Sequence, residues 1–596
     1  MLQHWMNGHP LPYEMNRSPL LALALLASAA LPVRAEAQAA LASARHTAVL
    51  RADSVRVLRG ARSAQATFER VRFQTLPWTD DGGSTWSCDE RIGRFCIWRN
   101  DTEADWRAPP DPPPLVRARD SLIATLTRAA QVTPGDGWVA GQRVRYLVEA
   151  GRTADAVHAA RDCHAEAWWC RALEGYALHF AREHVAAEQA FAAALAAMPA
   201  AERREWDALS PVLRDEDARG LRRMDAAARE AALARLWWLA DPFWMDAGND
   251  RRTEHYARRV ADRFQDRART TDGLFWADDL REILVRWGQP AGWERVRARF
   301  HQSGRASVIT HYSPSFEFIP SLEMAHAPLS IAADDWKTDE KTGHSLYAPP
   351  GVRRLLPLPH QVAVFPRGSS VEVVAAFAMR PDSLPPSPTL NAGLVLMRGP
   401  DATPIVRTAR VAGTRGVFRA AVPPDSTMVS LEVREPVSER AARARFGTDL
   451  RRPGRGGVAI SDVLLLEQPG ARPQSLDEAA ALARGSTRFR VGERLGVYWE
   501  VYGLEGKTDS VTFSVALARR PPGGIRRAAE NIGLARTVAP VRLRWDEEGP
   551  GVAIAPRSLG ISLPRLPAGE YVLEVAVRTR GGASAYTQRE IEVTTR

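Results

Sequence analysis

The chain contains 596 residues, and a typical domain size of about 150 residues predicts three to five units rather than one hydrophobic core. Its 80 basic and 70 acidic residues give a formal charge of +10, and all but three of the basic residues are arginine. The arginines lie among carboxylates along the chain, which is typical of a solvated surface of mixed charge. Nucleic acid is therefore not an expected partner.

The segment from Met15 to Ala37 is typical of a signal peptide. Arg17 precedes an uncharged apolar run over 19–31, and a small-x-small motif ends at Ala37, so cleavage is expected before Gln38. The apolar run is shorter than the roughly 20 residues needed to span a bilayer, and no later run is long enough for a transmembrane helix. We expect export to the periplasm or the cell exterior, with Met15 as an alternative start.

The four cysteines are expected to form two disulfides. An even number of cysteines in an exported chain favours pairing, and close spacing favours Cys88–Cys96 and Cys163–Cys170 among the three connectivities. Along one continuous helix the second pair would be about 10 Å apart, so a turn over 164–166 has to bring them together. The alternative, a zinc site, lacks the usual Cys-x-x-Cys spacing.

Residues 115–240 have a helical pattern that repeats once. The stretch 138–164 aligns without gaps on 169–195, and each copy has a turn in its middle. The second copy resembles a tetratricopeptide (TPR) helical hairpin through its pattern of small, aromatic and proline residues: Gly175, Ala187, Phe191, Ala194 and Pro199. The resemblance implies a short stack of helical hairpins.

A polar, helical segment after residue 240 leads to a second resemblance. Trp276 and Asp279 precede a predicted strand over 282–287 and a turn containing Gly288 and Pro290. This order is similar to the GWxTD-domain family of exported bacterial proteins and covers roughly 240–596. The resemblance implies β domains after the signature but no activity, because the family has no established biochemical activity.

Two signature positions differ: Phe275 stands where the family has Gly, and Asp278 where it has Thr. Considered physically, Trp276 is expected to be a core aromatic residue. Asp279 at the entry to the predicted strand is expected to cap local N–H groups.

The best candidate for chemistry is a polar cluster near the signature. It consists of Asn249, Asp250, Arg252, Glu254 and His255, with Asp278, Asp279 and Glu282 nearby in the chain. Carboxylates beside His and Arg can perform acid–base catalysis. The same residues also suit a helix cap, with Glu254 near capping-box spacing. On that second interpretation, Glu254→Ala and His255→Ala should leave stability nearly intact.

No other motif indicates a catalytic residue, metal ion or cofactor. Phosphate-binding and dinucleotide-binding glycine motifs, the Gly-x-Ser-x-Gly elbow and His-Glu-x-x-His are missing. His179 and His184 are five residues apart, which on one helix would place them on different faces. A small-molecule substrate is not indicated either.

From Gln361 the hydrophobic period becomes two, with short strands between Gly and Pro turns, which predicts β-sandwiches. The stretch 434–457 is interpreted as an exposed loop. Since the pattern is self-contained, we expect a chain that begins near Gln361 to fold alone. The stretch 566–573 resembles a turn and strand of immunoglobulin-like sandwiches.

The sequence thus predicts a multidomain α+β protein. Its expected units are a signal peptide at 1–37, an N-terminal segment with a disulfide loop and Pro-rich linker at 38–114, a TPR-like helical region at 115–240, a small α/β GWxTD-like domain at 241–350, a β-sandwich at 351–470 and an immunoglobulin-like β-sandwich at 487–596. The expected function is a non-enzymatic binding or scaffold protein of the bacterial cell envelope that contacts protein partners. The alternative is an exported hydrolase that uses Asn249–His255 and Asp278–Glu282.

Overall fold

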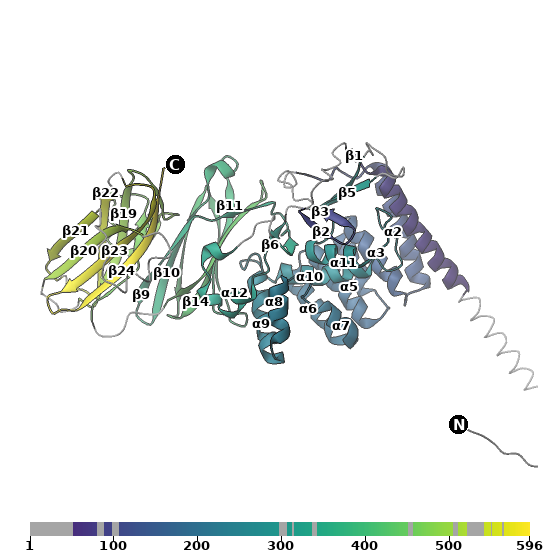
Figure 1. Ribbon diagram of the computed structural model, residues 1–596, viewed down its shortest axis with the longest axis horizontal. Coiled ribbons are helices and arrows are strands. Elements are labelled where there is room, and N and C mark those ends of the chain that lie inside the picture. Colours follow the sequence, from purple (N-terminus) through teal and green to yellow (C-terminus); the bar gives the residue numbers. More distant parts are fainter. Residues whose placement is uncertain are drawn as a thin grey trace, which may run out of the picture.

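The computed structural model describes most of the chain after residue 51. The described residues are 52–79, 89–97, 106–296, 307–312, 315–336, 343–450, 457–504, 510–520, 541–549, 551–562 and 566–595. The expected signal peptide and Cys88 lie outside them. The chain is a multidomain α+β protein, with helices at one end and two β units following in a row toward the C-terminus (Figure 1).

The helical part contains eleven described helices. They are a helix over 52–75, α2 (Pro113–Val132), α3 (Gly137–Glu149), α4 (Thr153–Arg161), α5 (Ala167–Phe180), α6 (His184–Ala197), α7 (Ala200–Trp206), α8 (Asp215–Arg223), α9 (Ala226–Ala240), α10 (Asp250–Arg263) and α11 (Asp278–Trp287). The two predicted repeats are the antiparallel pairs α3–α4 and α5–α6. Their turns use left-handed backbone at Gly151 (φ 71°) and Arg182 (φ 64°). A Cβ atom at Gly175 would lie 2.8 Å from Phe191, so this glycine allows α5 and α6 to pack closely.

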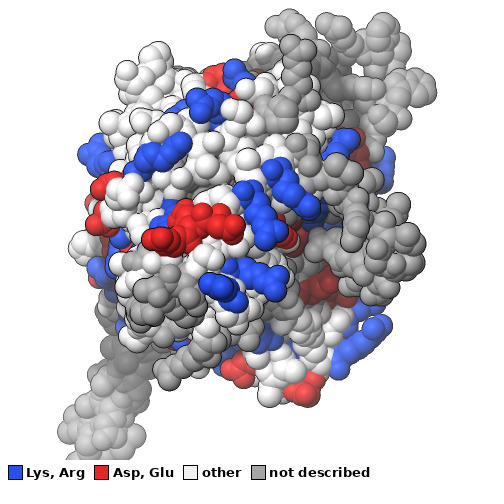
Figure 2. All heavy atoms as spheres, turned by 90° about the vertical axis from the view of Figure 1, so that its left-hand side faces the viewer, with Lys and Arg blue, Asp and Glu red and all other residues white. Residues whose placement is uncertain are grey.

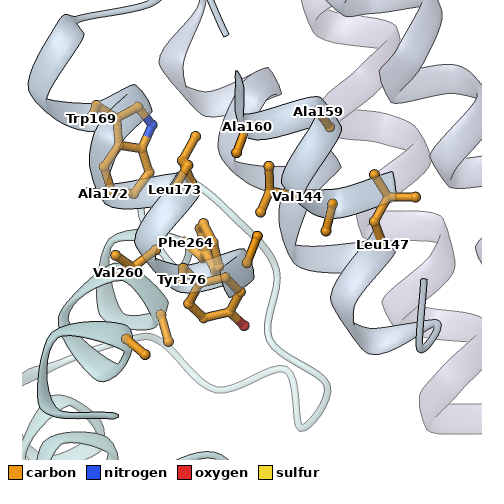
Figure 3. Close-up of a cluster of buried hydrophobic side chains, with 14 of the residues drawn as sticks. Val144, Leu147, Ala159, Ala160, Trp169, Ala172, Leu173, Tyr176, Val260 and Phe264 are labelled. Carbon is orange, nitrogen blue, oxygen red and sulfur yellow. The ribbon is translucent and has the colours of Figure 1, made fainter. Parts of the chain in front are cut away.

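Helix α10 packs against the hairpins and shares their hydrophobic core (Figure 3). The Phe264 ring, directly after α10, makes edge contacts with Trp169 and Tyr176 of α5, with centroid distances of 6.1 and 5.0 Å. Val260 is fully buried in the same cluster. The boundary predicted at residue 240 is therefore not a boundary between cores, because α10 lies against α5 and α6.

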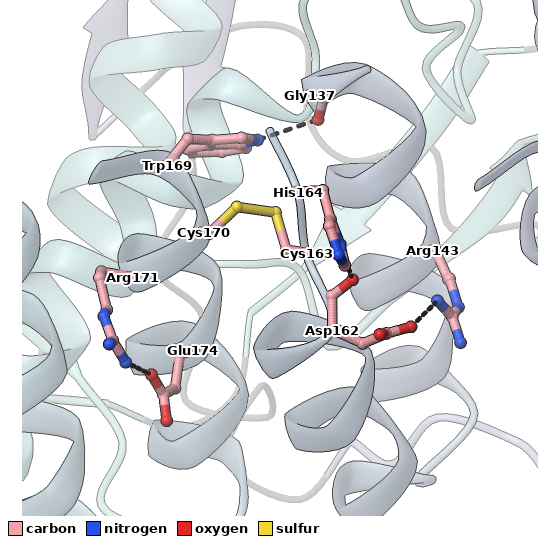
Figure 4. Close-up of a disulfide and its surroundings, with 9 residues drawn as sticks. All are labelled: Gly137, Arg143, Asp162, Cys163, His164, Trp169, Cys170, Arg171 and Glu174. Carbon is pink, nitrogen blue, oxygen red and sulfur yellow. Dashed lines mark hydrogen bonds and ion pairs between the residues drawn. A yellow bond between two sulfur atoms is a disulfide. The ribbon is translucent and has the colours of Figure 1, made fainter. Parts of the chain in front are cut away.

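Cys163 and Cys170 form a disulfide between the two hairpins (Figure 4). Helix α4 ends at Arg161 and α5 begins at Ala167, so the intervening turn brings the two Cα atoms to 5.5 Å. Beside the disulfide, Trp169 Nε1 donates to the carbonyl O of Gly137 at 2.9 Å, which ties α5 to the start of α3. Cys96 is also disulfide-bonded.

The strand predicted over 282–287 is wrong, because these residues belong to helix α11. Each apolar face of the helix meets a different cluster: Leu284 joins the hairpin core, Val285 packs with α8 and α9, and Trp287 packs near β2 and β7. The residues Leu280, Ile283, Leu284 and Trp287 have the i, i+3, i+4, i+7 spacing of a helix, so the sequence did contain a helical signal here. Glu282 and Arg286 form an i,i+4 ion pair of 3.0 Å on the same helix.

Small sheets surround this helix. They use β1 (Trp78–Thr79), β2 (Glu90–Ile92), β3 (Phe95–Ile97), β4 (Gly292–Val296), β5 (Ser307–His311), β6 (Phe316–Glu317) and β7 (Leu346–Tyr347), with the short helix α12 (Leu322–His326) between β6 and β7. Strands β1, β4 and β5 form one sheet, in which β1 runs parallel to β4.

The first β unit packs two sheets, in the orders β13-β10-β9 and β12-β11-β14-β15-β8. Its strands are β8 (Arg354–Pro357), β9 (His360–Arg367), β10 (Ser370–Ala378), β11 (Thr389–Met397), β12 (Ile405–Ala412), β13 (Arg415–Val422), β14 (Ser426–Glu435) and β15 (Arg440–Asp449). The predicted exposed loop over 434–457 is wrong for 440–449, which is the partly buried strand β15. Since β8 pairs with β15 and precedes Gln361, a chain that begins at Gln361 lacks one strand of this sheet.

The second β unit also packs two sheets, β16-β19-β17 with β22 on β19, and β18-β24-β23-β20-β21. Its elements are β16 (Ala459–Ile460), β17 (Leu464–Leu466), α13 (Leu476–Ala481), β18 (Arg488–Arg490), β19 (Arg494–Tyr502), β20 (Val511–Arg519), β21 (Val541–Glu547), β22 (Ile554–Ser562), β23 (Gly569–Thr579) and β24 (Ser584–Thr594). Since β16 and β17 pair with β19, strand pairing assigns 459–466 to this unit and not to the sandwich predicted at 351–470. Helix α13 packs between the two units.

A buried ion pair joins the helical part to the first β unit. Arg445 and Glu432 are both fully buried and lie 3.0 Å apart. Glu432 also accepts the backbone N–H groups of Trp244 (3.0 Å) and Met245 (2.8 Å), while Arg445 donates to the carbonyl O of Asp241 at 2.7 Å. The segment after α9 is therefore fastened to β14 and β15.

The surface at the C-terminal end carries both charge signs. Figure 2 shows arginine and acidic side chains interspersed on this face. Exposed pairs include Arg488–Glu592 at 2.6 Å and Arg520–Glu590 at 3.0 Å. This pattern agrees with the mixed-charge surface expected from the sequence.

Candidate functional site

The polar residues at the start of α10 face different neighbours. Asn249 is the N-cap, because its side chain accepts the N–H of Arg252 at 2.9 Å. The Arg252 side chain is exposed and lies 3.9 Å from Glu188. Both positions therefore have local structural partners at the surface.

Asp250 and His255 are buried on separate sides of the helix. Asp250 accepts a hydrogen bond of 3.0 Å from the Tyr347 hydroxyl, and burial raises its pKa. His255 is fully buried, and its Nε2 donates to the carbonyl O of Trp206 at 3.0 Å. Burial holds the pKa of His255 well below its ordinary value, so this imidazole is neutral. The two side chains are not arranged to act on one substrate.

Glu254 is part of a buried network and not of a capping box. Its two carboxylate oxygens lie 2.7 Å from Arg258 Nε and 2.8 Å from His179 Nε2. Burial alone would raise the pKa of Glu254, but Arg258 and His179 outweigh it and lower the pKa to about 2. These contacts lead us to revise the expectation that Glu254→Ala leaves stability nearly intact, since the change would leave Arg258 buried without its charged partner.

Arg258 connects this network to the end of α11 through hydrogen bonds. It donates to the carbonyl oxygens of Val285 (3.0 Å) and Arg286 (2.8 Å), which the end of a helix leaves unpaired, and to that of Leu346 on β7 (2.7 Å). Gly288 follows with φ 88°, and a Cβ atom there would lie 2.9 Å from Arg258 Nη2. The glycine of the signature turn thus ends α11 against the Arg258 side chain.

One triad-like arrangement does occur. Thr253 Oγ1 lies 2.9 Å from His179 Nδ1, and His179 Nε2 lies 2.8 Å from Glu254, which is the order of nucleophile, base and acid. However, Thr253 is only 1% exposed and its hydroxyl also lies 3.0 Å from the carbonyl O of Asp250. His184 is near the same hydroxyl, and its ring centroid is 5.4 Å from that of His179. The two histidines are thus neighbours, because they belong to different helices.

The acidic residues of α11 are separate from this network. Asp279, at the start of the helix, accepts hydrogen bonds from Arg94 (2.7 and 2.8 Å) and from the N–H of Leu280. The hydrogen bonds from Arg94 hold the pKa of Asp279 well below its ordinary value. The Asp278 side chain is almost fully exposed and pairs with Arg281. The cluster that the sequence suggests is therefore not gathered in one cleft.

Instead, a cavity of about 540 Å³ lies between residues of helix 52–75, α2 and α3 and residues of α11 and strands β4 and β5. Its volume is within the range of small-molecule sites. Trp276, Gly288 and Pro290 line it, whereas the five candidate residues at the start of α10 do not. Trp276 is held in place by a hydrogen bond from its Nε1 to Asp262 at 2.8 Å.

One wall of the cavity holds three arginines from three helices: Arg72, Arg119 and Arg145. Arg145 pairs with Glu149 at 2.9 Å, and Arg72 also contacts Glu149. Burial alone would raise the pKa of Glu149, but Arg72 and Arg145 outweigh it, so the pKa is lowered and the carboxylate stays charged.

A deeper layer of polar groups supports this wall. Glu69 is fully buried, and its carboxylate accepts hydrogen bonds from the hydroxyls of Tyr146 (2.6 Å) and Thr271 (3.0 Å). Gln65 donates to the Tyr146 hydroxyl at 3.0 Å. These contacts fix helix 52–75 against α3 and position the arginines.

The sequence did not reveal this cavity. Its lining extends from Arg72 to Tyr312, and no two arginines of the wall are close in the chain. The one local signal is the i,i+4 spacing of Arg145 and Glu149 on α3, which ordinary surface helices share. Among the residues that the structure describes, no group of three or more His, Cys, Asp or Glu side chains could hold a metal ion. In the same part of the chain, no helix combines the length and apolar character of a membrane span.

Comparisons with known proteins do not identify the chain. Neither a protein-family model nor a curated protein sequence matches it. A red sea bream transglutaminase structure is 10% identical with a TM-score of 0.13, and the match covers 54% of this chain and 44% of that chain. A tetra-tandem repeat from the extending region of a large adhesion protein is also 10% identical with a TM-score of 0.13, covering 40% and 50%. The chain thus spans half or less of either structure, and likeness this low supports no conclusion.

Proposed function

We propose that this chain is an exported, non-enzymatic binding or scaffold protein of the bacterial cell envelope. The proposal rests on one observation: the polar residues of α10 make contacts that join elements of the fold. Glu254 joins α10 to His179 of α5, Arg258 joins α10 to α11, and Asp250 and His255 are buried against other elements. The groups that acid–base chemistry would need are thus engaged in holding the fold.

Export is supported by the signal-like segment 15–37 and by the disulfide between Cys163 and Cys170, a bond that persists mainly in oxidising compartments. The order of Trp276, Asp279, Gly288 and Pro290 supports membership of the GWxTD-domain family.

The modules also suit binding. We interpret α3–α6 as TPR-like hairpins and the last β unit as immunoglobulin-like, two architectures that often serve as interaction modules. The inner face of the hairpins is filled by α10, so a partner would bind elsewhere: at the cavity beside α2 and α3 or on the β units.

The alternative is the exported hydrolase, and one observation favours it: the Thr253–His179–Glu254 arrangement. A hydrolase would require Thr253 to become accessible, because nucleophilic attack needs contact between the hydroxyl and the substrate.

Two parallel experiments test the proposal. The first treats the purified chain with a fluorophosphonate probe and with fluorogenic ester, peptide and glycoside substrates; we expect neither labelling nor turnover. Turnover or labelling that Thr253→Val abolishes, with the melting temperature unchanged, would contradict the proposal.

The second experiment isolates the envelope fraction after photo-crosslinking from exposed positions of the β units, such as Val437 and Tyr586, which are 82% and 68% exposed. We expect discrete crosslinked complexes, and their absence from every exposed position would count against a scaffold.

A further inference from the structure

The arginine wall of the cavity contains more buried positive than buried negative charge. Arg72, Arg119 and Arg145 are each more than nine-tenths buried, and two largely buried carboxylates, Glu69 and Glu149, face them. In addition, Arg119 Nε and Arg145 Nη1 are buried with no hydrogen-bond acceptor among the described residues. A buried N–H group without an acceptor is unfavourable, so the guanidinium groups of this wall lack part of their hydrogen-bonding partners.

Asp111, an acidic residue on the rim of the cavity, supplies one acceptor to the arginine wall. Residues 106–112 form an exposed, proline-rich strap along the cavity, anchored where the Trp106 ring stacks on His311 with a centroid distance of 4.0 Å. From this strap, Asp111 pairs with Arg119, although the Asp111 side chain is 42% exposed. The strap thus places a carboxylate, reachable from solvent, on one guanidinium of the wall.

Apolar and aromatic side chains line much of the same cavity. They include Phe264, Trp276, Leu280, Ile283, Trp293 and Tyr312. One further acid, Asp272, lines the cavity, and its carboxylate accepts the N–H of Leu274 at 3.0 Å. Guanidinium groups and aromatic side chains in one cavity suit a ligand with an anionic head and an apolar body.

We propose that this cavity binds a small amphiphilic carboxylate. Its head group replaces Asp111 on Arg119 and reaches toward Arg145, and its alkyl or aryl body lies against Phe264 and Trp276. In the unliganded protein Asp111 occupies the place of the ligand carboxylate. The proposal rests on the binding function proposed above and specifies one ligand class for it.

Isothermal titration of the full chain with decanoate and naphthoate tests the proposal, with decanol, decylamine and decyl phosphate as matched probes. We expect both carboxylates to bind, and decanol and decylamine to bind at least about tenfold more weakly, since a charged hydrogen bond contributes roughly that factor. Equal affinity for decanol would overturn the head-group assignment. Tighter binding of decyl phosphate would overturn the choice of a carboxylate.

Variants with opposite expected effects locate the head group. Arg119→Gln should weaken decanoate binding about tenfold, whereas Asp111→Asn should strengthen it several-fold because the competing carboxylate is removed. Arg117→Gln, an exposed position on the same helix, is the charge-matched control and should change nothing. Affinity unaffected by Arg119→Gln, or weakened by Asp111→Asn, would refute the proposal. If neither the wild-type chain nor the Asp111→Asn chain binds any probe, the ligand class is wrong, while the crosslinking result still decides the envelope function separately.

Discussion

Replacing Glu254 by Gln should destabilise the helical part strongly. The change keeps the shape of the side chain but removes the charge that faces Arg258 at 2.7 Å and His179 at 2.8 Å. The Arg258 guanidinium is almost fully buried, and breaking a buried ion pair from one side costs about 3–5 kcal/mol. Urea unfolding followed by the helical circular dichroism signal measures this loss.

The pKa of Glu254 gives a second estimate of similar size. Folding lowers the pKa from 4.5 to about 2, and at about 1.4 kcal/mol per pH unit this difference corresponds to about 3 kcal/mol. Because the folded-state pKa is depressed, this contribution is fully present above about pH 4.5 and is lost as the pH falls through 2. The Glu254→Gln chain should therefore lack the part of the acid destabilisation that occurs in this window.

The matched control is Glu282→Gln on α11. Its side chain is 48% exposed, so loss of the pair with Arg286 should cost less than about 1 kcal/mol. If Glu254→Gln were as stable as Glu282→Gln, the network would not hold the fold, and the case for a functional site on α10 would reopen.

Three further changes follow from the structure. Gly288→Ala should cost about 1–3 kcal/mol in urea unfolding, because φ is positive and the new methyl group would meet Arg258; wild-type stability would show that the turn adapts freely. Replacing Cys163 and Cys170 by Ser together should cost roughly 2–3 kcal/mol, and the effect should vanish when the wild type is compared under reducing conditions. In a chain that begins at Gln361, the first β unit should unfold at a lower temperature than in the full chain, because β8 and the segment that fastens β14 and β15 are missing, whereas the second β unit keeps its own core. An unchanged transition of the first β unit in circular dichroism would contradict this.

Local patterns predicted the helical hairpins well. The repeat of 138–164 over 169–195 depends on residues close in the chain, and the turns at Gly151 and Arg182 ended the helices where the sequence indicated. The turn between Cys163 and Cys170 could be predicted because only a turn allows a disulfide at that spacing.

Elements whose partners are distant in the chain were harder to predict. Helix α11 is different: its short apolar run at 283–285 was interpreted as a strand, although Leu280, Ile283, Leu284 and Trp287 have helical spacing. Strand β15 was taken for a loop because arginines interrupt its apolar pattern, yet Arg445 is fully buried against Glu432 and the segment after α9. A charged residue in a core has no local signal when its partner lies elsewhere in the sequence.

The residues of the candidate site also depend on partners that are distant in the chain. Asn249 could be identified as a cap from its position before α10, but the roles of Glu254 and His255 depend on His179 and Trp206. The arginine wall comes from three helices, so only the folded chain brings it together.

A double-mutant cycle between Glu254 and Arg258 tests the central claim most directly, namely that the polar residues of α10 fasten helices and do not perform chemistry. The unfolding free energies of the wild type, Glu254→Gln, Arg258→Met and the double variant give the coupling between the two side chains. We predict a favourable coupling of about 1–3 kcal/mol, as expected for partners in one buried network. A coupling near zero, with every variant fully folded, would contradict the account.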